Sequence, residues 1–495
     1  MSVYTSMRRV AAGAAMVAGA AVASPSSAQK APAKTAAFDR TAIPSPGTAP
    51  ALRVPTWSSM KLANGAQLIV SSRHNLPLVS VDINFVGGSD QYDPADKPGV
   101  GEFAGAMLSE GTKTKSGDDI SNALQLLGTG VRIGIGGEAG SISFLATTDK
   151  VERVLQIVED MLVNASFPTE AIERYRARRL VTLTQAKDRT AVIAGRVFAK
   201  TLYGTAHPYG RTVSEQSVQS ITRDDITNLA KSYFTPGHAI ITVVGDVEPA
   251  AVQAMMDRVL APWNAGGSMP SFDYPTVTPP KATTVYLVDK PGAAQSSFLI
   301  GLPGPARSTP DYYALEVLNT MLGGMFQSRL NADIREQKAY SYGVSSDFSY
   351  GKGPGSFRTG GDIVTAKTDS ALIEFMSQLR DIRGTRPVTD DELKMAEDNL
   401  VQSLPQNFSS VGAVNGSISD LYLEQLPQDY YQNYARNVRA VTKDDVTRVA
   451  NKYIDVDHVA IVIVGDRKQI EQPLKATNIA PVVVLDLNGD PVAVP

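Results

Sequence analysis

Few side chains in this sequence have the type and spacing that metal or nucleophilic catalysis requires. The 495 residues include no cysteine, which excludes disulfides, thiol catalysis and cysteine-bound zinc. The four histidines lie far apart and lack the i, i+4 spacing that places two imidazoles on one helix face: His74, His207, His238 and His458. We therefore predict that this chain alone forms no zinc site.

Arg335 and Tyr342, seven residues apart, offer a different chemistry. A guanidinium fork and a phenol both donate hydrogen bonds to peptide carbonyls. Donors aimed at a scissile bond also stabilise the oxyanion that develops there. Taken by themselves, the two residues fit better a structural arginine at a helix C-terminus and a buried tyrosine in a strand.

A duplicated unit supplies the elements that must position these residues. Segments 221–246 and 441–466 align without a gap at an offset of 220, and 11 of the 26 positions are identical. In each copy a threonine followed by two aspartates, at Thr222 and Thr442, is typical of a helix N-cap. A β-branched strand ending in Gly-Asp follows the helix. The repeat indicates two homologous domains.

Apolar periodicity indicates the class of fold. Residues 151–162 place their apolar side chains on one face of a helix, and Val79–Phe85 alternates as a half-buried strand. We predict an α+β chain of two homologous α/β-roll domains, 53–263 and 284–485, each a mostly antiparallel sheet flanked by helices. The Pro-rich stretch 264–283 is predicted to link them.

One segment of the first domain carries a resemblance to a known family. A strand ending at Gly87-Gly88 leads into a predicted helix, Val100–Leu108, which is followed by Glu110-Gly111-Thr112. This order resembles zinc peptidases of the insulinase/pitrilysin family (the inverzincins), in which a Gly-x-Ala-His-x-x-Glu-His helix occupies the same place. There the two histidines bind zinc, the glutamate is the general base and a downstream glutamate completes the site.

The alignment implies a degenerate zinc motif in this chain. Glu102 takes the place of the first histidine, Gly105 that of the general base and Ala106 that of the second histidine. The stretch between Glu173 and Asp188, where the family's third ligand would fall, contains no carboxylate. We interpret Gly105 and Ala106 as residues that allow close helix packing, and Glu102 as solvated or in contact with a partner.

The second domain retains a family pattern. Leu322-Gly323-Gly324, Ser328-Arg329-Leu330 and Ile334–Tyr342 resemble sequences of the family's C-terminal halves, with Ala339-Tyr340 in place of Gly-Leu. In that family the Arg/Tyr pair faces the zinc site across a closed chamber. The resemblance thus implies that Arg335 and Tyr342 bind and position substrate in an assembled enzyme.

The resemblance implies the non-zinc accessory subunit of a two-subunit bacterial metallopeptidase that degrades oligopeptides. This chain would hold no cofactor, and Zn²⁺ would lie in a homologous partner subunit carrying His-x-x-Glu-His. An unfolded oligopeptide would bind partly by strand addition to a sheet edge. The alternative is a catalytically inert scaffold or peptide-binding protein of the same fold. The net charge of −3, without a basic stripe, argues against nucleic acid as a partner.

The N-terminus is typical of an exported protein. Arg8 and Arg9 precede the apolar run Val10–Ala23, and small residues follow up to Ala28. This apolar run is shorter than the about 20 residues that a membrane-spanning helix needs. We therefore predict a signal peptide at 1–28. Residues rich in Ala, Pro, Ser and Thr then predict a flexible linker at 29–52. We expect a periplasmic location and no membrane span.

Overall fold

The computed structural model describes residues 52–492. The predicted signal peptide at 1–28, and all but the last residue of the predicted linker at 29–52, lie outside the described residues. Within the described part of the chain, no helix is long and apolar enough to cross a membrane.

The first half of the described chain contains a six-stranded sheet in the order β1-β2-β6-β3-β5-β4. Its strands are β1 (Ser58–Lys61), β2 (Gln67–Ser72), β3 (Leu78–Val86), β4 (Val131–Ile135), β5 (Ala139–Thr147) and β6 (Ala239–Gly245). Its helices are α1 (Ser89–Tyr92), α2 (Val100–Met107), α3 (Gly117–Leu126), α4 (Val151–Asn164), α5 (Thr169–Ala186), α6 (Thr190–Tyr203), α7 (Glu215–Ser220), α8 (Arg223–Tyr233) and α9 (Pro249–Val259).

The second half contains a six-stranded sheet in the order β12-β7-β11-β8-β10-β9. Its strands are β7 (Thr284–Asp289), β8 (Gln295–Pro303), β9 (Ser341–Ser349), β10 (Ser356–Val364), β11 (Ala460–Gly465) and β12 (Val482–Leu485). Its α-helices are α10 (Tyr312–Asn319), α11 (Thr368–Arg380), α12 (Asp390–Ser403), α13 (Val411–Leu423), α14 (Tyr430–Arg439), α15 (Lys443–Tyr453) and α16 (Arg467–Ala476). Two π-helical segments, η3 (Thr320–Gly324) and η4 (Asn331–Gln337), lie between α10 and β9.

The two sheets have the same topology, which confirms the predicted fold class. In each, two parallel strands (β2 and β6, or β7 and β11) are followed by antiparallel strands that end at an edge strand, β4 or β9. The sixth strand differs, because β1 precedes β2 in the chain whereas β12 follows β11 and pairs parallel with β7. The duplication therefore extends over five strands of each sheet.

Local sequence signals explain the repeated helix of each half. The Thr222 hydroxyl accepts a hydrogen bond from the Asp225 N–H, and the Asp225 side chain accepts from the Thr222 N–H. Thr442 and Asp445 repeat this capping box on α15. The predicted N-caps are confirmed, and the two helices end at the equivalent residues Tyr233 and Tyr453.

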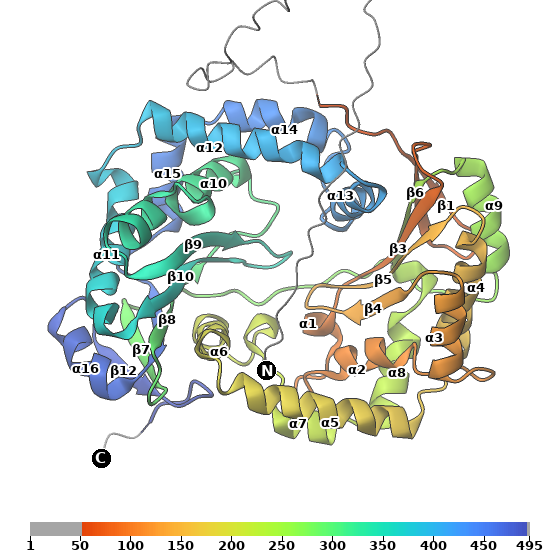
Figure 1. Cartoon of the computed structure of the whole chain (residues 1–495), viewed down its shortest axis with the longest axis horizontal. Helices are drawn as coiled ribbons and strands as arrows, with labels where there is room; N and C mark the ends of the chain where they lie inside the picture. Colours follow the sequence, from red (N-terminus) through yellow and green to blue (C-terminus); the bar gives the residue numbers. More distant parts are fainter. Residues whose placement is uncertain (1–51, 493–495) are drawn as a thin grey trace, which may run out of the picture. The chain divides into compact units, whose positions relative to one another are not determined.

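Two helices are exchanged between the halves (Figure 1). Helix α6 belongs to the first half in sequence, yet it packs on β8 and β11 of the second sheet. Helix α13 belongs to the second half and packs on β3 and β6 of the first sheet. The apolar residues of α6 form a cluster with β7 and β11 that includes Val197, Phe198, Val288 and Val462. Each half therefore completes the core of the other.

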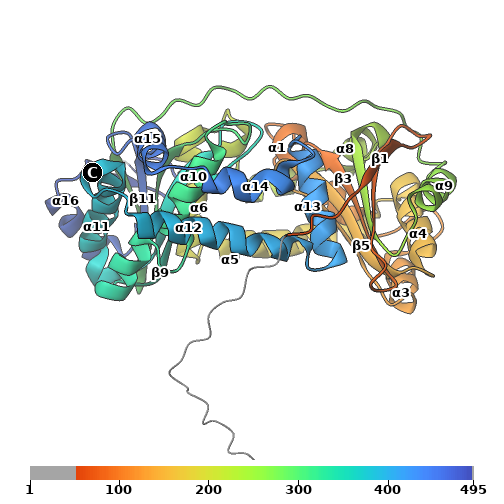
Figure 2. The same ribbon diagram turned by 90° about the horizontal axis from the view of Figure 1, so that it is seen from above.

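Residues 264–283 contain neither helix nor strand and run as an extended segment between the halves (Figure 2). The segment also packs on the first half. The Phe272 ring meets the Tyr92 ring edge-on at 5.6 Å, and the Gln91 side-chain amide donates to the Tyr274 hydroxyl at 3.1 Å.

Candidate substrate-facing site and a degenerate metal motif

Helix α2 is the element that would carry the metal motif, and its N-terminus is held by Asp93. The Asp93 carboxylate accepts hydrogen bonds from the backbone N–H groups of Gly99 and Gly101, both at 2.6 Å. Gly99 has a φ of 110°, a conformation that favours glycine. Burial raises the pKa of Asp93 to about 6, although these two hydrogen bonds act in the opposite direction. The helix is thus fixed where the chain enters it.

Glu102 is held by contacts within the chain and is not freely solvated, which corrects that part of our interpretation from the sequence. Its carboxylate accepts a hydrogen bond from the Tyr175 hydroxyl at 2.7 Å. Arg179 Nε lies 3.0 Å from the same carboxylate, and both side chains are partly shielded from solvent. Tyr175 and Arg179 are one turn apart on α5, so the ion pair fastens α2 to α5.

Gly105 and Ala106 pack closely, as predicted. A Cβ atom on Gly105 would stand 3.1 Å from the backbone nitrogen of Ile135 and 3.2 Å from Gly134 Cα. Ala106 packs against the core of the first half. Helix α2 therefore lies directly against strand β4, and the glutamate that a general base requires does not fit at position 105 without moving backbone.

This donor set does not fit a zinc ion. At the aligned positions the chain offers one carboxylate, Glu102, which is already paired with a guanidinium, and no imidazole. Among residues 52–492, no three His, Asp or Glu side chains are grouped so that they could hold a metal. The histidines have separate local partners, namely His74 with Asp246, His207 with Tyr209, His238 with Tyr233 and His458 with Asp455.

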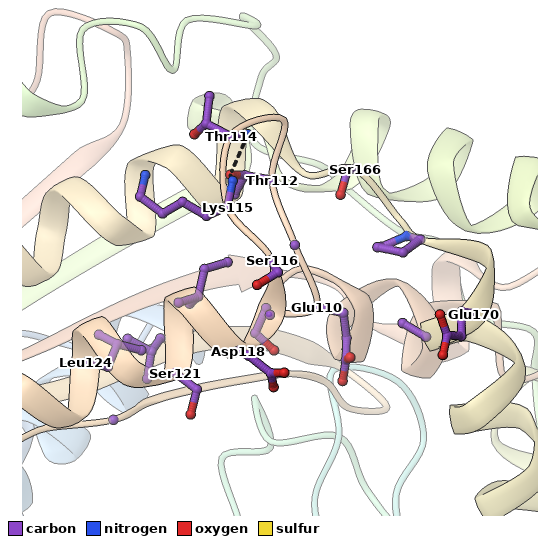
Figure 3. A pocket seen from close by; sticks show the side chains of 18 of the residues that line it. Glu110, Thr112, Thr114, Lys115, Ser116, Asp118, Ser121, Leu124, Ser166 and Glu170 are labelled. Carbon is purple, nitrogen blue, oxygen red and sulfur yellow. Dashed lines mark hydrogen bonds between the residues drawn. The ribbon is translucent and has the colours of Figure 1, made fainter.

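The Glu110-Gly111-Thr112 turn after α2 lines a groove of about 1100 Å³ (Figure 3). Glu110 pairs with Arg174 of α5 at 2.5 Å, and the Thr112 hydroxyl accepts hydrogen bonds from the N–H groups of Thr114 and Lys115. These contacts hold the turn to α5 and to the loop before α3. They are local and structural.

In the second half, the Arg/Tyr pair lies at the edge of the sheet. Tyr342 lies near the start of the edge strand β9 and is 92% exposed, which excludes the buried strand tyrosine that the residues alone allowed. The pairing of β9 with β10 shifts register here, so that an extra residue lies in β9 between Ser341 and Val344. Such a β-bulge changes the direction of the side chains it carries. It presents Tyr342 to solvent.

Arg335 lies on η4, just before this strand. Its guanidinium stacks over the ring of Phe326 at 4.1 Å and lies 3.1 Å from the Glu336 carboxylate. The side chain keeps part of its surface exposed. Phe326 is itself an exposed aromatic residue. Arg335 is therefore oriented by its neighbours without being buried by them.

A buried asparagine ties the element of Arg335 to the strand of Tyr342. Asn331 Nδ2 donates to the Val344 carbonyl at 2.8 Å, and Asn331 Oδ1 accepts from the Val344 N–H at 3.1 Å. This side-chain amide makes the two hydrogen bonds that a neighbouring strand would make with Val344, and it fixes η4 against β9. Between the two elements, Ala339 adopts a φ of 53°, at the position where the resembling family has glycine.

Arg329, from the Ser-Arg-Leu string, has a structural role. Its side chain is buried and binds both carboxylate oxygens of Glu392 on α12, at 2.7 and 2.8 Å. It also donates to the carbonyls of Arg386 and Pro387. Sequence reasoning did not find this pair, nor the Glu102–Arg179 pair. For the latter, the only signal was the run of arginines between Arg174 and Arg179.

The comparisons with known proteins agree with the fold. A family profile described as insulinase, peptidase family M16, matches residues 68–208. A second profile, described as the peptidase M16 inactive domain, matches residues 220–400. An uncharacterized zinc protease of Streptomyces coelicolor is 26% identical over 380 residues, which cover 73% of this chain and 80% of that protein.

Solved structures share the fold. A peptidase M16 inactive domain from Pseudomonas fluorescens superposes with a TM-score of 0.76 at 25% identity, covering 83% of this chain and 98% of that one. The periplasmic protease PqqL of Escherichia coli gives a TM-score of 0.70 at 17% identity, covering 84% of this chain and 46% of that one.

Fold and site together define a peptidase-type duplicated α+β chain whose own metal motif is degenerate. The chain belongs to the insulinase family of peptidases, family M16.

Proposed function

We propose that this chain is the non-zinc accessory subunit of a two-subunit zinc peptidase that degrades oligopeptides. The observation that carries the proposal is the contrast between its two halves. In the first half, an ion pair and close packing occupy the positions of the metal motif. In the second, Arg335 and Tyr342 are presented on an edge strand and the π-helical segment beside it.

The chemistry assigned to this pair is hydrogen-bond donation. Arg335 and Tyr342 have N–H and O–H donors directed away from the core, and a scissile peptide accumulates negative charge on its carbonyl oxygen during attack. Phe326 and Asn331 reduce the freedom of these donors before substrate arrives. The attacking water and its zinc ion would belong to a homologous partner subunit that carries His-x-x-Glu-His.

The edge position of β9 also suits an extended peptide. A strand added at an edge is held by backbone hydrogen bonds, which makes binding tolerant of sequence. In the described part of the chain, β9 pairs with a strand on one side only, β10. On its other side Asn331 occupies the N–H and C=O of Val344, so a peptide would add beside the first residues of the strand, around Tyr342. A periplasmic location, after export through the N-terminal signal, is part of the proposal and is supported by the likeness to a periplasmic protease.

The test is reconstitution. The purified mature chain should contain no stoichiometric zinc and should not hydrolyse fluorogenic oligopeptides. After mixing with a chain that carries His-x-x-Glu-His, from a neighbouring gene or from co-purification, turnover should exceed that of the partner alone. Stoichiometric zinc and hydrolysis by this chain alone would contradict the proposal. No gain on mixing would favour the second candidate, an inert scaffold or peptide-binding protein of the same fold.

A further inference from the structure

Phe326 and Tyr342 are the two exposed aromatic residues of the described chain, and both belong to the segment around Arg335. Phe326 is 59% exposed and Tyr342 is 92% exposed, whereas every other Phe, Tyr and Trp among residues 52–492 is buried or half-buried. A single exposed apolar residue is common on a protein surface. Two aromatic residues around an arginine are instead typical of binding sites, where both residue types are enriched.

The segment that carries Phe326 is fixed to the strand that carries Tyr342. Phe326 lies in the turn between η3 and η4, and both of these segments pack on β9. The buried Asn331 amide, which binds β9, also donates to the Ser328 hydroxyl at 3.2 Å and to the Met325 carbonyl at 3.4 Å, from residues after and before Phe326. One side chain therefore holds together the turn of Phe326, η4 and β9.

Part of the Phe326 ring already contacts Arg335. The guanidinium of Arg335 lies over the ring at 4.1 Å, and a guanidinium keeps several N–H donors at its edges for a second partner. Successive residues of an extended peptide are only about 3.3 Å apart along the chain. A peptide carbonyl that accepts a hydrogen bond from Arg335 therefore brings a neighbouring side chain to the exposed part of the Phe326 ring.

The surroundings of these two aromatic residues are polar. Gln327, Glu336 and Gln337 are all exposed. Two exposed rings bordered by polar side chains offer enough apolar surface for one or two residues of a ligand, whereas a stable subunit interface needs an apolar centre built from many more. The site therefore suits a peptide side chain better than the surface of a partner subunit.

We propose that Phe326, together with Tyr342, binds an apolar side chain of the substrate next to the peptide group that Arg335 holds. Phe326 is then a specificity-determining residue. The inference rests on the proposed function and assigns its substrate class: oligopeptides with a large apolar residue, aromatic or aliphatic, at this position. The driving force is the removal of the exposed ring and of the substrate side chain from water.

The experiment measures direct peptide binding by the full-length purified chain, using fluorescence anisotropy. The probe is an N-acetylated decapeptide of serine and glycine with one central phenylalanine and a C-terminal fluorophore, and the comparison is the same peptide with central serine. We expect the phenylalanine peptide to bind at least about tenfold more tightly. A third peptide, with central lysine, separates an apolar contact from the attraction of a cation to the two rings.

Variants at an exposed position connect the preference to Phe326 without disturbing the core. Phe326→Ser removes the ring and should lower the preference for phenylalanine toward unity, whereas Phe326→Tyr keeps the ring and should keep the preference. Leu126→Ser is the matched control, because it removes another exposed apolar side chain, 86% exposed on α3, and should leave the preference unchanged. Near-ultraviolet circular dichroism verifies the fold of each variant.

Four results would overturn the inference. They are equal affinity of the parent for the phenylalanine and serine peptides, tighter binding of the lysine peptide, a preference that survives Phe326→Ser, and no binding of any peptide. If the preference survives while Phe326→Ser weakens association with a zinc-bearing partner, the ring belongs to the subunit interface instead. Reconstitution tests the proposed function separately, because peptide preference is measured on this chain alone.

Discussion

Ala339 has the left-handed backbone conformation that joins the segment of Arg335 to the strand of Tyr342. An L-residue in this conformation costs about 1–2 kcal/mol, which glycine avoids while losing more chain entropy on folding. We expect Ala339→Gly to stabilise the chain by about 0.5–1 kcal/mol in chemical denaturation. Ala332→Gly, within η4, is the matched control and should destabilise it. Destabilisation by Ala339→Gly would show that the strain is absent.

Single residues also show what the sequence could not predict. The loss of zinc ligands at Glu102, Gly105 and Ala106 was predicted from the resemblance to the family, which aligned these positions with its zinc motif. The ion pair of Glu102 with Arg179 was not, because the partners are 77 positions apart and meet only after α2 and α5 pack. Likewise, no local pattern placed Tyr342 on a β-bulge, since a bulge is a property of two paired strands.

At the scale of elements, helix α2 packs so closely on strand β4 that a glutamate side chain at position 105 has no room. We expect Gly105→Ala to destabilise the chain by about 1–3 kcal/mol, because its Cβ would press on the backbone of Ile135. Gly195→Ala, on α6, is the control: no atom lies within 4 Å of the added Cβ, so helix propensity should make it neutral or stabilising. Equal melting temperatures for the two variants would contradict this packing.

The ion pair between Arg329, which lies just before η4, and Glu392 on α12 predicts that the stability of the chain depends on pH. Burial alone would raise the pKa of Glu392, but Arg329 and the Thr389 N–H lower it from 4.5 to about 2. A lowered folded-state pKa means that the stabilisation is complete above pH 4.5 and is lost as the pH falls toward 2. Unfolding free energy should therefore decline by on the order of 2 kcal/mol over this range because of Glu392.

Glu392→Gln tests this assignment. The variant should be less stable than the parent at pH 7, and its free energy of unfolding should change less between pH 4.5 and 2. Glu397→Gln, on the same helix, is the control, since burial raises the pKa of that carboxyl and outweighs the nearby Arg439 and Lys394. An unchanged slope in Glu392→Gln would assign the acid sensitivity to other carboxylates.

The elements themselves were largely predictable. Strand β3, helix α4 and the capped helices α8 and α15 follow from periodicity and N-cap residues, which act over a few positions. The π-helical segments η3 and η4 were not anticipated, because their sequences differ little from those of ordinary helices. They place the Leu-Gly-Gly string and Arg335 beside β9.

At the scale of the whole described chain, the exchange of α6 and α13 joins the two halves. The repeat predicted two similar domains, and the two sheets confirm it. It gave no sign that each half would contribute a helix to the sheet of the other, because an apolar helix face does not specify which sheet it covers.

The most direct test of the central claim is the turnover of the reconstituted two-chain enzyme with Arg335→Ala or Tyr342→Phe in this subunit. We predict that kcat falls by roughly 10²–10³-fold, because donors to the developing oxyanion are lost, while zinc content and complex formation stay at the parent level. Arg436→Ala, an exposed arginine on α14, should have no effect. Parent-level turnover in both variants would contradict the assignment of Arg335 and Tyr342 to the substrate.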